Sequence, residues 1–139
     1  MSKTYSEKNI ERYAGLTGIR KKPTPYIGPT DSDGLWTCWR EPADNTVDQA
    51  LAGRNKLVHL IADKEPNVYW VIDAGEGIPV GQKEFEDERG RKEKLSTFYV
   101  VTGLTHAGAN FKGDTISRGT HGIGIKATNA MSKRFTVWT

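Results

Sequence analysis

The longest amphipathic pattern in the chain covers residues 33–51. Apolar residues recur there at helical spacing and Gly53 supplies a stop, so the pattern predicts a helix with one face in the core and one polar face. Pro42 lies inside this helix and has no amide to donate to the carbonyl of Cys38. We therefore expect a kink or a break next to Glu41.

The next two apolar runs predict a β-hairpin. KLVHLIAD at 56–63 and NVYWVID at 67–73 are separated by a short turn that contains a proline. Further along, residues 95–108 and 122–132 predict two more helices, and KRFTVWT at 133–139 predicts a final strand.

Other segments are less regular. Ser6 is a candidate cap for a short helix that ends at Tyr13, and Pro23 and Pro25 predict an extended segment after it. The segment QKEFEDERGRKEK at 82–94 is almost entirely charged, which predicts a solvated loop.

Length and composition limit the class of protein. A chain of 139 residues with 36% hydrophobic content is enough for one domain with one modest core. No apolar run approaches the roughly 18 residues of a membrane span, and the amino terminus lacks the apolar core of a signal peptide, so we expect a cytoplasmic protein with no membrane partner. The one cysteine, Cys38, falls in an apolar helical run and is interpreted as a buried thiol without a chemical role. A net charge of +3 does not by itself indicate a partner.

Acidic and amide side chains gather in the middle of the helix at 33–51. Glu41, Asp44, Asn45 and Asp48 lie within two turns, and Glu41 and Asn45 are one turn apart on a shared face. A carboxylate can act as a general base, and an amide oxygen is a neutral ligand suited to Mg²⁺.

A second signal is VIDAGEGIPVG, in which a predicted strand ends at Asp73. This carboxylate could accept a hydrogen bond from the amine of a purine, while Gly75 and Gly77 let the backbone approach the ring. The same pattern is also that of a simple turn.

A third signal is SRGTHGIGIKATNA, in which Gly119, Gly122 and Gly124 lead into a predicted helix. The free amides and the positive dipole end of a helix start attract phosphate, although a glycine-rich helix start can also be an ordinary loop. His106 and His121 have no carboxylate at metal-ligand spacing, and by spacing alone we interpret them as packing residues.

The order of the three signals along the chain is that of an ATP site. Together they would supply a base, a Mg²⁺ ligand, an adenine reader and a cradle for the triphosphate. Each signal is weak alone, and the combination favours the functional interpretation.

These motifs resemble the amino-terminal ATPase domain of type IIA topoisomerases, the gyrase B and topoisomerase IV ParE subunits of the gyrase, chaperone, histidine-kinase and MutL (GHKL) superfamily. The matching stretches are IRKKPTPYIG, EPADNTVDQALAG, IDAGEGIPVG, HAGANF and GTHGIGIKATNAMS, which together extend over nearly the whole chain. The resemblance implies a Bergerat ATP-binding fold. This is an α/β two-layer sandwich with a mixed, largely antiparallel sheet and helices on one face, here truncated at the C-terminus.

The resemblance also implies one domain over residues 1–139 with three special segments. Residues 1–15 match an amino-terminal arm, residues 82–94 a charged loop longer than usual, and residues 106–120 a nucleotide lid. Tyr5 lies in the arm, which in the family clasps a second copy of the subunit.

The family's site roles transfer to positions of this sequence. Glu41 matches the general base that activates water, Asn45 the Mg²⁺ ligand and Asp73 the adenine-binding aspartate. The residues implied to bind the cofactors ATP and Mg²⁺ are Asn45, Asp48, Asp73, Gly75, Gly77, Ile78, Pro79, Gly119, His121, Gly122, Ile123 and Gly124.

Some positions depart from the family pattern. Glu76 replaces an arginine, Asn110 replaces a lysine, and Ile116 lies near a position that often holds a tyrosine. These departures suggest a phage or otherwise divergent version. With the family's later strands and transducer lysine missing after Thr139, we expect little or no ATP turnover from this chain alone.

The expected function is that of a Mg-ATP-binding ATPase domain whose ATP binding and hydrolysis drive DNA strand passage. The implied partners are ATP, a second copy of the chain, and an A-type topoisomerase subunit and DNA through further domains. Two alternatives stay open: a non-hydrolysing nucleotide-binding regulator or decoy of a topoisomerase, and an ATPase of chaperone or mismatch-repair type. The DNTVDQALAG helix argues against the second.

Overall fold

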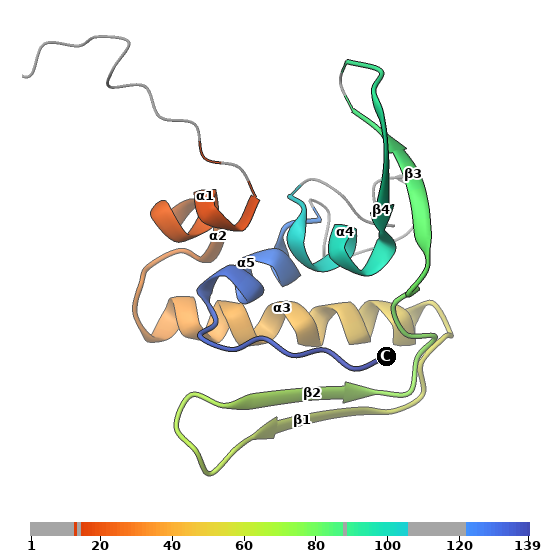
Figure 1. The fold of residues 1–139 in the computed structure, drawn as a ribbon. Coiled ribbons are helices and arrows are strands. Elements are labelled where there is room, and N and C mark those ends of the chain that lie inside the picture. The colour runs from red at the N-terminus through yellow and green to blue at the C-terminus, as the bar shows by residue number, and fades with distance from the viewer. Residues whose placement is uncertain (1–12, 14, 88, 106–121) are drawn as a thin grey trace, which may run out of the picture.

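The computed structural model describes residues 13, 15–87, 89–105 and 122–139. Its elements in chain order are α1 (Gly15–Lys21), α2 (Thr24–Ile27), α3 (Ser32–Leu51), β1 (Val58–Ala62), β2 (Tyr69–Asp73), β3 (Gln82–Glu86), β4 (Lys92–Ser96), α4 (Thr97–Gly103) and α5 (Gly124–Met131). The strands form two separate two-stranded antiparallel sheets, β1–β2 and β3–β4. The β1–β2 hairpin lies along α3 in the layer of helices, and the β3–β4 hairpin projects away from that layer (Figure 1). This mixture of helices and short antiparallel sheets is compatible with the expected α/β class. The single mixed sheet that we expected is not formed by the described residues.

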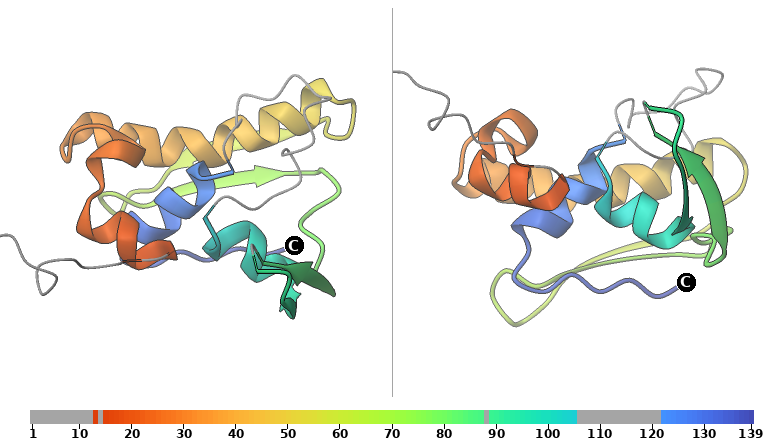
Figure 2. Two further views of the ribbon diagram at one scale, coloured as in Figure 1. Left: turned by 90° about the horizontal axis from the view of Figure 1, so that it is seen from above. Right: turned by 45° about the horizontal axis from the view of Figure 1, so that its top comes forward.

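Helix α5 lies at the centre of the helical layer, between α1, α3 and α4 (Figure 2). Three side-chain bonds connect it to these neighbours. The Arg20 Nε donates to the Ala130 carbonyl at 2.8 Å, the Thr128 hydroxyl to the Cys38 carbonyl at 2.8 Å, and the Asn129 amide to the Thr102 carbonyl at 2.9 Å. The apolar core forms around the same helix and consists of Ile19, Ile27, Cys38, Ala127 and Ala130, with Leu16 and Tyr26 packed against it.

Helix α3 confirms the longest amphipathic pattern of the sequence. The Asp31 side chain caps its start by accepting from the Asp33 amide at 3.0 Å. The predicted break at Pro42 is wrong, because the helix continues through this residue. Pro42 cannot donate to the Cys38 carbonyl, and the Thr128 hydroxyl of α5 donates to it instead.

The β1–β2 hairpin is also confirmed. Val58 pairs with Asp73 and Ala62 with Tyr69. The Tyr69 ring faces α3, with its centroid 5.6 Å from that of Trp39.

The segment at 133–139 is not a strand, so the prediction of a final strand is wrong. It runs beside the hairpin as extended chain (Figure 1), where Trp138 stacks on Trp70 at 5.8 Å.

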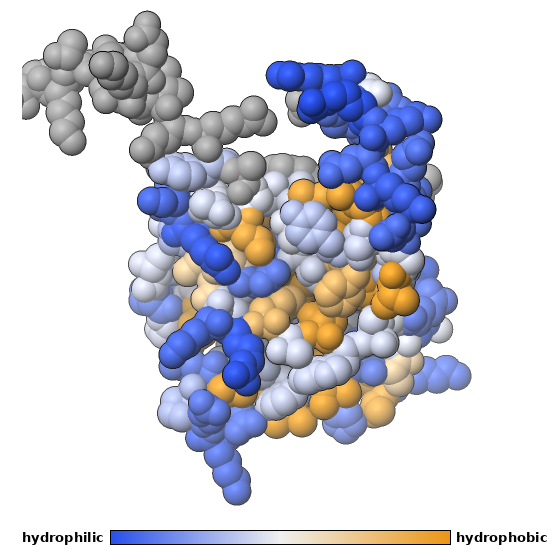
Figure 3. Space-filling view, viewed as in Figure 1, coloured by the Kyte–Doolittle hydropathy of each residue, from blue (hydrophilic) through white to orange (hydrophobic). Residues whose placement is uncertain are grey.

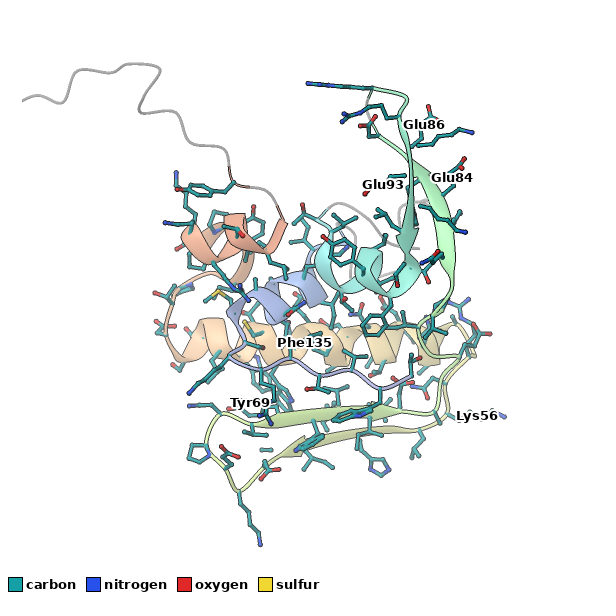
Figure 4. All side chains as sticks on the ribbon, in the orientation of Figure 1. Lys56, Tyr69, Glu84, Glu86, Glu93 and Phe135 are labelled. Atoms are coloured by element: carbon teal, nitrogen blue, oxygen red, sulfur yellow. The ribbon has the colours of Figure 1, made fainter. Side chains whose placement is uncertain are left out.

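The charged segment 82–94 forms most of a second hairpin instead of the predicted loop. Its charges pair with one another: Lys92 lies 3.0 Å from Glu84, and Arg91 lies 2.7 Å from Asp87 at the turn. The hairpin projects from the body of the molecule (Figure 4) and is strongly hydrophilic (Figure 3). Charge content hid the strand signal, because an exposed antiparallel pair can be stabilised by cross-strand ion pairs without an apolar face.

The extended segment predicted from Pro23 and Pro25 is wrong as well. This region forms α1 and α2, and the two prolines lie at the start of α2, where a missing amide costs no intrahelical bond.

The predicted helix at 95–108 is shorter in the structure, since α4 ends at Gly103. The helix predicted to end at Tyr13 lies almost entirely outside the described residues. The helix predicted at 122–132 is confirmed as α5.

Candidate functional site

Glu41 and Gly124 meet where α3 packs against the first turn of α5. Gly124 begins α5, and a Cβ added there would overlap the Glu41 carboxylate, with only 2.6 Å to its Cδ. The missing side chain therefore lets the carboxylate lie directly against the helix start. The structure thus brings the predicted general base to one end of the predicted phosphate-binding turn.

The Glu41 side chain is half-buried at this contact. Burial raises the pKa of its carboxyl above the ordinary value, the Arg40 charge opposes the rise, and the Asp44 charge adds to it. Arg40 and Asp44 also face each other at 3.7 Å as an i,i+4 pair. A carboxyl pKa that is shifted toward neutrality suits a residue that exchanges protons during a reaction.

Asn45 and Asp48 follow on the same helix. Asn45 is exposed, so its amide is accessible one turn after Glu41, and Asp48 is half-buried. Among the described residues, no three or more His, Cys, Asp or Glu side chains form a group that could hold a metal ion. A Mg²⁺ ion at Asn45 would therefore need phosphate oxygens and water as further ligands, which is how this ion is often held.

Asp73 ends β2 and is exposed. Its Oδ1 accepts from the Gly75 amide at 2.7 Å, so one carboxylate oxygen shapes the turn that follows the strand. A carboxylate has a second oxygen that can accept from a ligand donor. Asp73 can therefore stabilise a turn with one carboxylate oxygen while the other is available for the predicted hydrogen bond to adenine.

Asn55 connects the Asp73 turn to α3 and was not predicted from the sequence. This side chain is 5% exposed; its Nδ2 donates to the Thr46 carbonyl, and its Oδ1 accepts from the Leu57 and Ala74 amides, each at 3.2 Å. One asparagine thereby fixes the residue after Asp73 relative to the helix that carries Glu41. No sequence signal marked it, since asparagine is common in loops for local reasons.

The loop after Asp73 is held by distant residues. Gly77 has a φ of +73°, and a Cβ there would lie 2.5 Å from the Thr139 Oγ1. That hydroxyl accepts from the Ile78 amide at 2.7 Å, while the Thr97 hydroxyl donates to the Pro79 carbonyl at 2.5 Å. Gly77, Ile78 and Pro79 thus form a braced edge beside the Asp73 turn.

A basic group lies at this turn even though position 76 is acidic. The Arg54 guanidinium lies 3.9 Å from the Glu76 carboxylate, and both side chains are substantially exposed. Arg54, in the loop that follows α3, therefore places a positive charge next to the acidic position 76.

Lys126 is a further residue that the sequence analysis missed. It lies on the first turn of α5, is 1% exposed, and its Nζ donates to the Gly122 carbonyl. Burial lowers the pKa of its ammonium group to about 8. The spacing Gly-x-Gly-x-Lys at the helix start was the available signal, and it places a cation beside the predicted phosphate turn.

Cys38 is buried, as predicted. Burial raises the pKa of its thiol above the ordinary value and the nearby Glu41 charge adds to the rise. A thiol in this state is a poor nucleophile, which agrees with the structural role assigned to it.

Comparison with curated proteins gives the same family as the motifs. The chain is 40% identical over 136 residues to the DNA topoisomerase 4 B subunit of Mycoplasma capricolum subsp. capricolum and, over the same length, to the DNA gyrase B subunit of Mycoplasmoides gallisepticum. It is 36% identical over 136 residues to the DNA gyrase B subunit of Campylobacter jejuni subsp. jejuni. These alignments cover 96% of this chain. The chain is a homologue of gyrase B and topoisomerase IV B.

This gyrase B homologue spans 20% of the length of the first two relatives and 17% of the third. No protein-family model matches it. The named relatives confirm the resemblance that the motifs indicated, whereas the individual site residues stay predictions.

Part of the predicted site lies outside the described residues. This holds for Gly119, His121 and His106, for the whole predicted lid at 106–120, and for most of the predicted arm at 1–15, including Tyr5. Of the glycine turn, the structure describes Gly122, which has a positive φ of 59°, and Ile123, which is half-buried.

Proposed function

We propose that this chain is the Mg-ATP-binding region of a type IIA topoisomerase B subunit, built on a Bergerat-type fold as one domain. The observation that carries the proposal is the contact between the Glu41 carboxylate and Gly124. Two motifs far apart in sequence, one suited to activating water and one to holding phosphate, meet at this point.

Each part of the site would have a distinct task. The Asp73 carboxylate accepts a hydrogen bond from the adenine amine, and the braced edge at Gly77, Ile78 and Pro79 supports the ring. The glycine turn at residues 119–124 offers backbone amides to the triphosphate, and the positive end of α5 favours its charge. The Glu41 carboxylate orients an attacking water and accepts its proton.

The fit of ATP is supported by the absence of a side chain at Gly124. A Cβ there would overlap the Glu41 carboxylate, so a glycine at this position lets Glu41 lie at the start of the proposed phosphate turn. Mg²⁺, when bound, would neutralise phosphate charge, and Asn45 is the residue that would hold it, with Asp48 shaping the pocket nearby. The charge of Lys126 beside the turn would add to phosphate attraction below a pH of about 8.

In the complete assembly, ATP binding and hydrolysis would drive DNA strand passage. We propose as partners a second copy of this chain through residues 1–15, and an A-type subunit and DNA through further domains. The site of action would be the cytoplasm. Among the described residues, no helix is both long and apolar enough to cross a membrane.

The test is nucleotide binding and turnover by the purified chain. We expect weak, Mg²⁺-assisted binding of a non-hydrolysable ATP analogue in calorimetry and very slow phosphate release. Glu41→Gln should keep the affinity within about threefold and remove the residual release, because a base acts on the water more than on ground-state binding. Glu84→Gln, on the projecting hairpin, is the matched control.

Three outcomes would change the conclusion. No binding of the analogue at millimolar concentration would refute the ATP site. Binding without phosphate release above the protein-free background, in the parent as in Glu41→Gln, would favour a non-hydrolysing regulator of a topoisomerase over an ATPase region. Release above that background and equal in the two proteins would refute the role of Glu41 as the base.

A further inference from the structure

Pro42 leaves one carbonyl of α3 without its usual helical donor. In a regular helix the amide of residue 42 would bond to the carbonyl of Cys38, and a proline has no such amide. The Thr128 hydroxyl, from the centre of α5, donates to this carbonyl at 2.8 Å. Thr128 is buried, so it satisfies an acceptor that lies in the core.

The same two helices make the Glu41 contact one turn away. Gly124 lies four residues before Thr128 on α5, and Glu41 lies three residues after Cys38 on α3. The two pairs run in opposite directions along the two helices, which therefore cross as antiparallel neighbours. Two adjacent contacts of this kind fix both the distance and the register between α3 and α5.

We propose that Thr128 is a positioning residue for Glu41, and that its hydroxyl takes the place of the missing Pro42 amide. This inference rests on the proposed function, since it concerns the residue expected to activate water. Without the hydroxyl, the Cys38 carbonyl would be left in the core without a donor, and α3 would have to bend at this point for it to find another partner. A bend there would move the Glu41 carboxylate away from Gly124.

The geometry favours this role over an ordinary helical threonine. A threonine in a helix often donates back to the carbonyl four residues earlier, and Thr128 has that option at Gly124, at 3.3 Å. The bond to Cys38 on the other helix is shorter, at 2.8 Å. Gly124 also has the Thr128 backbone amide as a helical donor, whereas the Cys38 carbonyl has lost its own.

The experiment is a double-mutant cycle in the full chain. Thr128→Val removes the hydroxyl with little change in shape, and Pro42→Ala restores an amide to α3. We expect Thr128→Val to lower Tm by about 3–6 °C in the parent and by much less in the Pro42→Ala background. Thr128→Ser keeps the hydroxyl and should stay near the parent. An equal loss of Tm in both backgrounds would overturn the proposal.

A second readout separates positioning from general stability. The pKa of the Glu41 carboxyl, followed by NMR, reports its burial against α5. It should fall toward the ordinary value in Thr128→Val and stay raised in the double variant, although Arg40 and Asp44 are unchanged in both. A pKa that does not move in Thr128→Val would overturn the positioning role.

Nucleotide binding and phosphate release tell the two proposals apart. If the parent binds the ATP analogue and releases phosphate from ATP, Thr128→Val should bind the analogue within about threefold of the parent but lose the residual phosphate release, and the double variant should recover the release. Equal phosphate release by parent and Thr128→Val would refute the inference alone. If the parent binds no analogue, the ATP site is refuted, and the Tm cycle and the Glu41 pKa still decide whether Thr128 positions this carboxylate.

Discussion

Replacing Asn55 by alanine is the sharpest test of how the two halves of the candidate site are joined. The buried side chain makes three hydrogen bonds at 3.2 Å, to the Thr46 carbonyl and to the Leu57 and Ala74 amides. The Ala74 amide keeps a second acceptor, the Leu57 carbonyl at 3.3 Å. The substitution therefore removes all three bonds, although the Ala74 amide keeps its backbone acceptor.

The expected loss in the free energy of unfolding follows from these hydrogen bonds. A hydrogen bond between neutral groups contributes about 1 kcal/mol net, and a buried partner left unpaired adds to the loss. Asn55→Ala should therefore lower the free energy of unfolding by about 2–3 kcal/mol. Asn129→Ala is the matched control, because its side chain donates one described bond, to the Thr102 carbonyl, and should cost about 1 kcal/mol.

Urea unfolding of the three proteins measures these differences, and calorimetry with an ATP analogue measures the effect on the site. We expect Asn55→Ala to weaken nucleotide binding under conditions in which the variant is still folded, because the residue after Asp73 is no longer fixed relative to α3. A cost for Asn55→Ala no greater than that for Asn129→Ala would refute the bond count. Unchanged nucleotide affinity would refute the link between the turn and the helix.

Two further predictions concern single groups. Asp73→Asn should weaken binding of adenine nucleotides in calorimetry, because an amide can present a donor where the purine amine requires an acceptor; parent-like affinity would exclude Asp73 as the adenine reader. Lys126→Met should raise the free energy of unfolding, measured in urea at pH 7, because burial of the ammonium group destabilises the parent. Between pH 8 and about 10.5 the unfolded chain of the parent binds more protons than its folded state, so the stability of the parent rises with pH and the advantage of the variant should shrink. An advantage that is independent of pH would contradict a buried ammonium group.

The regular elements could be predicted where the signal was local. The helical spacing in α3 and the two apolar runs of β1–β2 gave both elements nearly to their ends. The β3–β4 hairpin could not be predicted, because most of its positions are charged, as in the pair of Lys92 and Glu84, and its half-buried apolar residues Phe85 and Leu95 form too short a pattern. The pattern of charge content alone cannot distinguish such a hairpin from a loop.

Pro42 shows why a correct local rule gave a wrong result. The proline does remove a helical bond, and the predicted consequence was a kink or a break, of which the break does not occur. The compensating donor is Thr128, distant in sequence and packed against α3 only in the folded chain. Tertiary partners of this kind leave no periodic signal.

The same difference between local signals and tertiary contacts separates the residues of the candidate site that could be predicted from those that could not. Glu41 and Gly124 were predicted from separate motifs, and the structure places them in contact. Two residues that hold the parts together were missed. Asn55 is a single polar residue in a loop and carries no pattern, and Lys126 is marked only by its spacing from Gly122 and Gly124. Motifs indicate the groups that carry out chemistry more readily than the groups that support them.

The central place of α5 has a consequence for the way the molecule opens. This helix has eight residues, too few to be stable in isolation, and its side-chain bonds reach α1, α3 and α4. Its amides should therefore exchange with solvent deuterium only when the whole helical layer unfolds, more slowly than those of the projecting β3–β4 hairpin. Because the proposed phosphate turn leads directly into α5, a bound nucleotide would slow exchange throughout the helical layer, including at amides that it never touches.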